Sequence, residues 1–183
     1  MVANEQAARP TSVVVVMGVS GSGKTTIGAL VADAKTVPFV DADDLHPIDN
    51  VKKMAAGTPL DDEDRWPWLD IVGRRLQEAE ESGEGVVMAC SALRRVYRDR
   101  IRATAPSTIF LHLHGSLEVL TARIEGRSGH FMPPALLSSQ METLEALTED
   151  ETGYVLDIGQ SVEQMIDEAL PALQSIRDEM PRG

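Results

Sequence analysis

Eight residues near the start of the chain have the types and the spacing of a phosphate-binding loop. Residues 18–25 match the pattern G-x-x-x-x-G-K-[ST], in which a glycine-rich turn presents backbone N–H groups to an anion. Lys24 can reach the β- and γ-phosphates of a nucleotide, and the hydroxyl of Thr25 can join a magnesium coordination shell. We expect the loop to contact ATP through Gly18, Ser20, Gly21, Ser22, Gly23, Lys24, Thr25 and Thr26.

The segments on either side of this loop supply the context that the motif needs. The apolar run 13–17 predicts a buried strand before the loop, and residues 26–34 have the composition of a helix after it. A helix N-terminus adds a partial positive charge where the phosphates would lie. The alternative is a glycine and serine turn with an unrelated lysine, and it leaves the order of strand, loop and helix unexplained.

Two carboxylates follow the next apolar run, 37–40. Asp41 and Asp43 lie two positions apart, so in an extended segment both side chains would share one face. They would also lie at the carboxyl end of a strand, where open α/β sheets bind their ligands. The alternative is a solvated acidic turn in which Asp44 caps the following helix.

The remaining apolar runs and helical periodicities alternate along the chain, which predicts a three-layer α/β/α fold around a five-stranded parallel sheet. Residues 1–183 are expected to form a single domain, with a flexible tail over 1–11 and a mobile lid at about 125–135, a segment rich in glycine, basic residues and proline. The predicted strands are 13–17, 37–40, 86–89, 108–113 and 154–157, and the predicted helices are 26–34, 49–56, 64–79, 93–103, 117–124 and 162–176.

Composition excludes several classes of protein. A net charge of −12 argues against a general nucleic-acid binder, which needs a basic face. Cys90 is the only cysteine, so no internal disulfide can form, and its apolar neighbours favour a buried strand residue over a nucleophile. No apolar run approaches the length that spans a membrane, and a cytoplasmic protein is expected.

A longer set of motifs resembles the small gluconokinases of bacteria and eukaryotes, from about residue 13 to the end of the chain. The resemblance implies transfer of the ATP γ-phosphate to the 6-hydroxyl of D-gluconate, with Mg²⁺, on a fold like those of adenylate kinase and shikimate kinase, and it suggests a homodimer. The motifs are Asp41-Ala42-Asp43-Asp44-Leu45-His46-Pro47, Asn50, Lys53-Met54, Gly57-Thr58-Pro59-Leu60, Asp64-Arg65, Pro67-Trp68-Leu69, Cys90-Ser91-Ala92-Leu93 and Gly129-His130-Phe131-Met132-Pro133.

The resemblance also assigns roles around the transferring phosphoryl group. Similarity to the related shikimate kinases implies that Asp41 holds magnesium through water and that Asp43 accepts a hydrogen bond from the acceptor hydroxyl. Because phosphoryl transfer requires little early proton removal, positioning by Asp43 is favoured over strong base catalysis. Similarity to the wider kinase group implies that Arg123 covers the adenine or the phosphates, and that Arg127 meets the γ-phosphate. The alternative is a pair of surface arginines bridging nearby glutamates.

Gluconate has a carboxylate and several hydroxyls, so its site should offer a guanidinium group and polar donors. Arg65 and Arg94 are the candidates for the carboxylate, with a surface salt bridge as the alternative for each. His46 and His130 are candidates through the motif match alone. The arginines at 95, 98, 100 and 102 are expected to form surface salt bridges.

Two other functions remain to be weighed against gluconate phosphorylation. One is another small-molecule kinase of the same fold, such as a shikimate kinase. The other is a nucleotide-binding regulator without turnover, against which Lys24, Thr25, Asp41 and Arg127 all argue. No Asn-Lys-x-Asp sequence occurs, which disfavours a GTPase.

Overall fold

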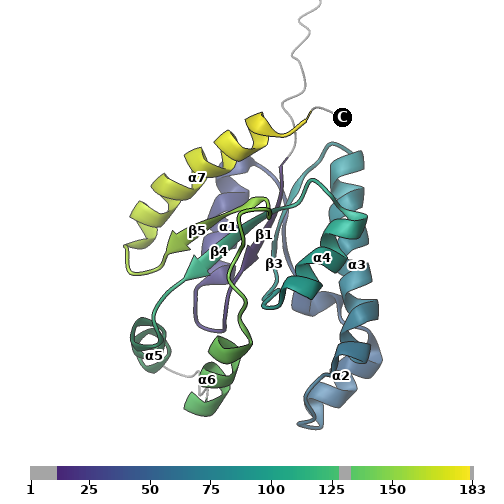
Figure 1. Cartoon of the computed structure of the whole chain (residues 1–183), viewed down its shortest axis with the longest axis vertical. Coiled ribbons are helices and arrows are strands. Elements are labelled where there is room, and N and C mark those ends of the chain that lie inside the picture. Colours follow the sequence, from purple (N-terminus) through teal and green to yellow (C-terminus); the bar gives the residue numbers. More distant parts are fainter. Residues whose placement is uncertain (1–11, 128–132, 182–183) are drawn as a thin grey trace, which may run out of the picture.

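A computed structural model describes residues 12–127 and 133–181 of the chain. Its centre is a five-stranded sheet in which all neighbouring strands run parallel, as the sequence predicts (Figure 1). The strands are β1 (Val13–Met17), β2 (Phe39–Asp41), β3 (Val86–Ala89), β4 (Ile109–His114) and β5 (Gly153–Asp157). The helices are α1 (Lys24–Lys35), the 3₁₀ turn η1 (Ala42–Leu45), α2 (Ile48–Ala55), α3 (Asp62–Glu81), α4 (Arg95–Thr104), α5 (Leu117–Glu125), α6 (Pro134–Thr143) and α7 (Val162–Glu179).

The strand order is β2-β3-β1-β4-β5, so the strand that carries the phosphate loop lies in the middle of the sheet. Helices α1 and α7 pack on one face, and α3 and α4 pack together on the other (Figure 1). Parallel strands need such crossover helices, which is why both faces of the sheet are covered. The remaining helices, α2, α5 and α6, lie beyond the carboxyl ends of the strands (Figure 1).

Each face of the sheet has its own apolar core, because successive side chains of a strand point to opposite faces. In β1, Val14 and Val16 join the core beneath α1 and α7, whereas Val13, Val15 and Met17 join the core beneath α3 and α4. All five side chains are almost fully buried. The apolar run that predicts this strand is therefore continuous because both of its faces are covered.

The structure moves some predicted boundaries. The second strand is shorter than its apolar run, because it begins at Phe39 and ends at Asp41, where η1 starts. The third helix begins earlier than residue 64, because Asp61 and Asp64 form a capping box in which each side chain accepts a hydrogen bond from the other's backbone N–H. A further helix, α6, follows the proposed lid segment.

One arginine of α4 is buried, although the sequence predicts that it forms a salt bridge at the surface. Arg98 is fully buried and forms an ion pair with Glu151, with Nε donating to Oε1 at 2.7 Å. Nη1 donates to the carbonyls of Ala92 and Leu93, and Nη2 donates to Oε2 of Glu151. Ala92 has a left-handed φ of 43°. The prediction was wrong because the ion pair lies between segments more than fifty residues apart. By contrast, Arg95 and Arg100 form the expected surface pairs.

Candidate active site

The phosphate loop leaves β1 and enters α1 in a conformation that only glycine adopts easily. Gly18, Gly21 and Gly23 all have positive φ angles, of 145°, 79° and 96°. Space is equally restricted, because a Cβ on Gly21 would lie 2.6 Å from Cγ1 of Ile124, on α5. The loop is therefore closely covered by α5, and its glycines permit both the turn and the contact.

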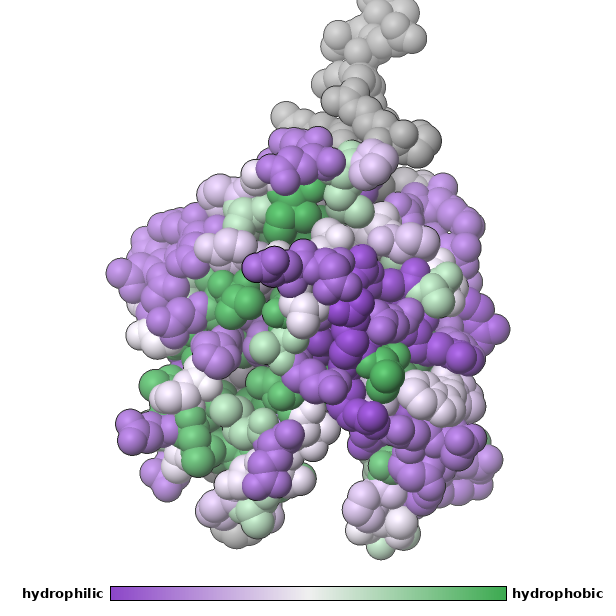
Figure 2. All heavy atoms as spheres, in the orientation of Figure 1, coloured by the Kyte–Doolittle hydropathy of each residue, from purple (hydrophilic) through white to green (hydrophobic). Residues whose placement is uncertain are grey.

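Two cavities meet at this loop. The first, of about 370 Å³, is lined by the loop together with Asp41, Asp43, the segment from Ala89 to Ser91, and α5. The second, of about 580 Å³, lies on the side of Gly23, Thr26 and Gly126. Both cavities are lined by Gly21, Lys24, Thr25 and Arg127. The molecular surface has an indentation between the side of the molecule with α5 and α6 and the side with α2 (Figure 2).

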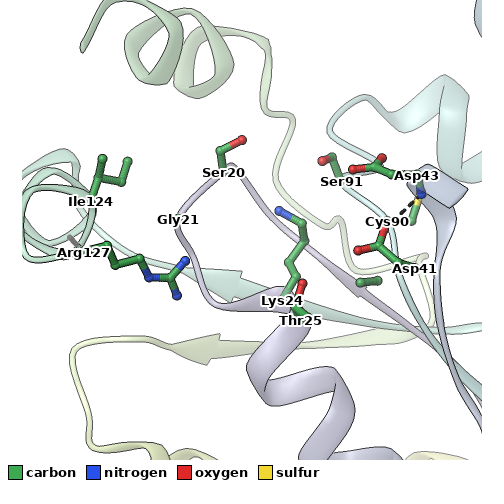
Figure 3. A pocket seen from close by; sticks show the side chains of 11 residues that line it. Ser20, Gly21, Lys24, Thr25, Asp41, Asp43, Cys90, Ser91, Ile124 and Arg127 are labelled. Carbon is green, nitrogen blue, oxygen red and sulfur yellow. Dashed lines mark hydrogen bonds between the residues drawn. The ribbon is translucent and has the colours of Figure 1, made fainter. Parts of the chain in front are cut away.

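Lys24 lies between the two sets of charges that line the first cavity. Figure 3 shows its side chain between Arg127 on one side and Asp41 and Asp43 on the other. Its ammonium group donates a hydrogen bond to the carbonyl of Val19 at 3.0 Å. Burial lowers the pKa of Lys24, and the two carboxylates act in the opposite direction.

Asp41 and Asp43 both face this cavity, although the extended segment expected to align them is absent. The backbone N–H of Asp43 donates to Oδ1 of Asp41 at 3.0 Å, which caps the turn η1 and bends the chain. The 3₁₀ turn, rather than the pleat of a strand, thus brings the two carboxylates together. Burial by the surrounding protein and the Asp41 carboxylate raise the pKa of Asp43. Because 83% of its side chain is exposed to solvent, we regard this rise as small.

The oxygen atoms at this edge suit magnesium. The hydroxyl of Thr25 and the carboxylate of Asp41 line the same cavity, and Mg²⁺ prefers such oxygen ligands together with water and phosphate. Among the described residues, no three His, Cys, Asp or Glu side chains form a metal-binding cluster. The site therefore fits a cation held partly by the nucleotide and not one held by a protein cage.

The two arginines near the proposed lid lie differently from one another. Arg127 is exposed, follows the end of α5 and lines both cavities. Arg123 lies within α5, donates a hydrogen bond to the carbonyl of Ile158, and places Nη1 3.7 Å from the Cβ position of Gly23. Over residues 12–127 and 133–181, neither arginine forms an ion pair with Glu118 or Glu125. The expected shared helical face is incomplete, because α5 ends at Glu125.

Arg65 and Arg94 meet around one aromatic side chain. Nη1 of Arg65 donates to the hydroxyl of Tyr97 at 2.9 Å, and this hydroxyl donates to Oδ1 of Asp62 at 2.7 Å. Nη1 of Arg94 donates to the other oxygen of Asp62 at 2.9 Å. Both guanidinium carbons lie within 5.5 Å of the Tyr97 ring centre. The structure therefore brings the two predicted arginines together, although neither lines the first cavity.

His46 packs between the acidic turn and Trp68. Its ring stacks on Trp68 with 4.2 Å between the centroids, and Nδ1 lies 3.3 Å from Nδ2 of Asn50. Only 5% of its side chain is exposed, and Nε2 lies 4.0 Å from Oδ1 of Asp43. Burial lowers the pKa of His46, which favours the neutral ring. His130, the other predicted histidine, lies outside the described residues, as does most of the proposed lid.

Relatives of the chain share nearly its whole length. It is 43% identical over 164 residues to the thermosensitive gluconokinase of Escherichia coli, which covers 89% of this chain and 88% of the relative. It is 41% identical over 171 residues to a probable gluconokinase of Xenopus tropicalis, covering 85% and 90% of the two chains. The crystal structure of a gluconokinase from Sinorhizobium meliloti superposes with a TM-score of 0.83, at 46% identity, and covers 93% of this chain and 95% of that one.

The chain belongs to the gluconokinase family. The sequence profile of the shikimate kinases also matches residues 20–172, so this gluconokinase-family chain has the P-loop kinase fold expected from its sequence. The residues that line its two cavities come from four separate stretches of sequence, 20–26, 41–43, 89–91 and 124–127. In a P-loop kinase, catalysis depends mainly on positioning and electrostatics, which such a convergence can provide.

Sequence reasoning missed several residues of this gluconokinase-family site. Tyr97 lies in the arginine-rich helix α4, whose arginines were expected to form surface salt bridges. Its hydroxyl nevertheless links Arg65 to Asp62. Gln140 contacts the phosphate loop at Ser20, although no motif marks it. Cys90 is buried as expected and also lines the first cavity. Burial raises the pKa of this thiol to about 12, so it is protonated and a poor nucleophile.

Proposed function

We propose that the chain is an ATP-dependent gluconate 6-kinase. The observation that carries the proposal is the arrangement of two cavities that share Lys24, Thr25 and Arg127, with a pair of carboxylates in only one of them. A kinase needs such a division, because the donor and the acceptor must approach the same phosphoryl group from opposite sides. The family relationship at about 40% identity supports gluconate as the acceptor.

The nucleotide would occupy the second cavity and place its γ-phosphate near Lys24. Lys24 and Arg127 would neutralise the charge that develops on the phosphoryl oxygens during transfer. Thr25 and Asp41 would hold Mg²⁺, which, when bound, would supply positive charge that offsets the charge of the phosphates. Arg123 lies against the loop and near Ile158, and we propose that it covers the nucleotide.

The acceptor would enter the first cavity with its 6-hydroxyl near Asp43. Oxygen of this hydroxyl attacks the γ-phosphorus, the bond to the β-phosphate oxygen breaks, and ADP leaves with the electron pair. Asp43 would orient the hydroxyl and take up its proton as the new bond forms. Because the rise in its pKa is small, it favours acceptance of that proton only slightly, and positioning of the hydroxyl is the main role that we propose for Asp43.

The rest of the sugar acid would lie toward Arg65 and Arg94. Their guanidinium groups can bind a carboxylate, and each uses one hydrogen bond to a protein partner among the described residues. Arg65 also lies close enough to His46 to lower its pKa, which links this pair to the acidic turn. His46 and, by motif alone, His130 are proposed as further acceptor contacts.

A coupled assay of ADP release tests the proposal. The purified chain is supplied with Mg-ATP and, in turn, with gluconate, shikimate, a nucleoside monophosphate and adenylyl sulfate. We expect turnover with gluconate, and Lys24→Ala should abolish it because the γ-phosphate loses its cation. Turnover with shikimate instead would favour the related kinase indicated by the family profile. ATP binding without turnover on any acceptor would favour a regulator.

A further inference from the structure

A glutamine on α6 makes two hydrogen bonds to the phosphate loop. The backbone N–H of Ser20 donates to Oε1 of Gln140 at 2.7 Å, and Nε2 of Gln140 donates to Oγ of Ser20 at 3.2 Å. The first bond fixes the orientation of the carboxamide, because a backbone N–H can only donate. The two residues are 120 positions apart in the sequence, so the contact joins two separate parts of the fold.

The contact lies at one particular end of the loop. Ser20 lines the cavity that contains Asp41 and Asp43, and it does not line the second cavity on the side of Thr26. In the proposed reaction, this end faces the phosphoryl group as it passes to the acceptor. Gln140 therefore holds the loop where donor and acceptor meet.

One buried residue anchors the helix that carries Gln140. Leu137, one turn earlier on α6, is 2% exposed and belongs to the core beneath α1 and α7. Met141 packs against the same core. The loop, by contrast, is rich in glycine, which gives it more conformational freedom to lose than other residues would have. A side chain on a helix that contacts the core thus restrains a glycine-rich segment.

We propose that Gln140 is a positioning residue for phosphoryl transfer, which holds the acceptor end of the phosphate loop in its ATP-binding shape. The proposal rests on the proposed kinase function for its kinetic consequence but not for its effect on nucleotide affinity. An organised loop has less freedom to lose when ATP binds, so the contact increases affinity without touching the nucleotide.

The test replaces the carboxamide while keeping the shape of the side chain. Gln140→Met retains the length and the packing of the residue but removes both hydrogen bonds. Calorimetric titration with a nonhydrolysable ATP analogue and Mg²⁺, without acceptor, should show about fivefold weaker binding, as expected for the loss of a typical hydrogen bond. In steady-state assays, kcat should fall and the KM for ATP should rise, while the KM for gluconate should stay within twofold.

Gln174→Met is the matched control, because Gln174 lies exposed on α7 and its side chain bonds Asp178. It should leave the affinity and both KM values unchanged. Gln140→Asn keeps the carboxamide but is one methylene too short, so it should reproduce the defect of the methionine variant. If Gln140→Met does not fold, Gln140→Asn is sufficient to test the proposal.

Three results would overturn the proposal. Unchanged affinity and kcat would mean that the contact does not organise the loop. Tighter binding of the analogue would mean that Gln140 competes with phosphate for the Ser20 N–H. Equal rises in the KM for ATP and for gluconate would indicate general damage to the structure. If the unaltered chain bound the analogue but did not phosphorylate gluconate, the proposed function would fail while the affinity test still stood.

Discussion

Lys24 is one of the residues that line both cavities of the site. Its ammonium group rests on the carbonyl of Val19 in the same loop, close to where a phosphate would bind. The lysine can therefore exchange a neutral acceptor for an anionic one by a small movement. Hydrogen bonds to charged groups are stronger than those between neutral groups, so this exchange favours the bound nucleotide.

Asp43 should matter much more for turnover than for nucleotide binding. We expect Asp43→Asn to lower kcat with gluconate at least about a hundredfold, because the neutral amide orients the hydroxyl less strongly than a carboxylate does and cannot take up its proton. The dissociation constant of the ATP analogue should change less than threefold. Steady-state kinetics and calorimetry measure the two quantities. Asp44→Asn, at an exposed neighbour, is the control and should change neither.

The pH profile gives a second measurement of the same residue. Because the pKa of Asp43 is raised, although only slightly, activity should fall with decreasing pH at a slightly higher pH than an unperturbed aspartate would give. This acidic limb should be absent from the residual activity of the asparagine variant. If activity fell at the same pH in both proteins, the acidic limb would belong to another ionisable group.

His112 should make the fold sensitive to acid. It is 2% exposed, and both ring nitrogens lack a hydrogen-bond partner among the described residues. Burial, with His114 and Arg98 nearby, lowers its pKa to about 4 from 6.5. Between these two values the unfolded chain binds a proton that the folded chain does not, so stability falls as pH falls below 6.5.

Urea unfolding at pH 7 and pH 4.5 measures this effect. Linkage predicts that His112 alone removes about 2 to 3 kcal/mol of the free energy of unfolding between these pH values. In His112→Leu this part of the pH dependence should be missing, whereas His114→Leu, at an exposed position, should retain it. An identical pH dependence in all three proteins would contradict the assignment.

Among the elements, α4 is connected to two loops through the side chain of Arg98. The buried guanidinium group binds Glu151 before β5 and the carbonyls of Ala92 and Leu93 after β3. These last two residues follow Cys90 and Ser91, which line the first cavity. The ion pair therefore fixes the backbone beside the acceptor side of the site.

Removing one partner of this ion pair should be costly. Arg98→Met should lower the free energy of unfolding by about 3 to 5 kcal/mol, because the Glu151 carboxylate would remain buried without its partner. Combining it with Glu151→Leu should recover part of the loss. Arg100→Met, which breaks an exposed pair with Asp70, should cost about 1 kcal/mol or less. Denaturant unfolding of the four proteins checks the series, and equal losses for the two single variants would contradict it.

The same elements show what the sequence could predict. Apolar runs predicted all five strands, because β1, β3 and most of β4 are buried and the edge strands β2 and β5 are partly buried. The phosphate loop and the acidic turn were also predictable, because their chemistry is local. The bend between Asp41 and Asp43 depends on a side-chain cap that competes with the strand. Arg98 and Gln140 could not be found, because their partners lie far away along the chain.

Across the whole molecule, charge is divided unevenly. The chain carries a net charge of −12, yet Lys24, Arg123 and Arg127 gather around the phosphate loop. A local cationic site on an acidic protein can bind a small anion while the remaining surface disfavours long polyanions. Within the described residues, no helix is long and apolar enough to cross a bilayer. A homodimer and a cytoplasmic location stay predictions.

The chain should unfold as one unit. Both cores share the strands of one sheet, so we expect a single calorimetric transition for residues 1–183, in agreement with the single domain predicted from the sequence. Mg-ATP should raise the temperature of the whole transition. At a hundred times its dissociation constant, it should increase the free energy of unfolding by about 2.7 kcal/mol. Two transitions, of which ATP moved only one, would show that the chain contains independent parts.

The central position of β1 has a consequence for how the protein is made. A ribosome synthesises this strand before its partners in the sheet, Val86–Ala89 and Ile109–His112, which follow much later in the sequence. Until then, the apolar Val13–Met17 segment has no place to be buried in the nascent chain. Pairing across such separations is slow and leaves apolar surface open to aggregation. We therefore expect the strand that delivers the phosphate loop to benefit from a chaperone's protection during translation.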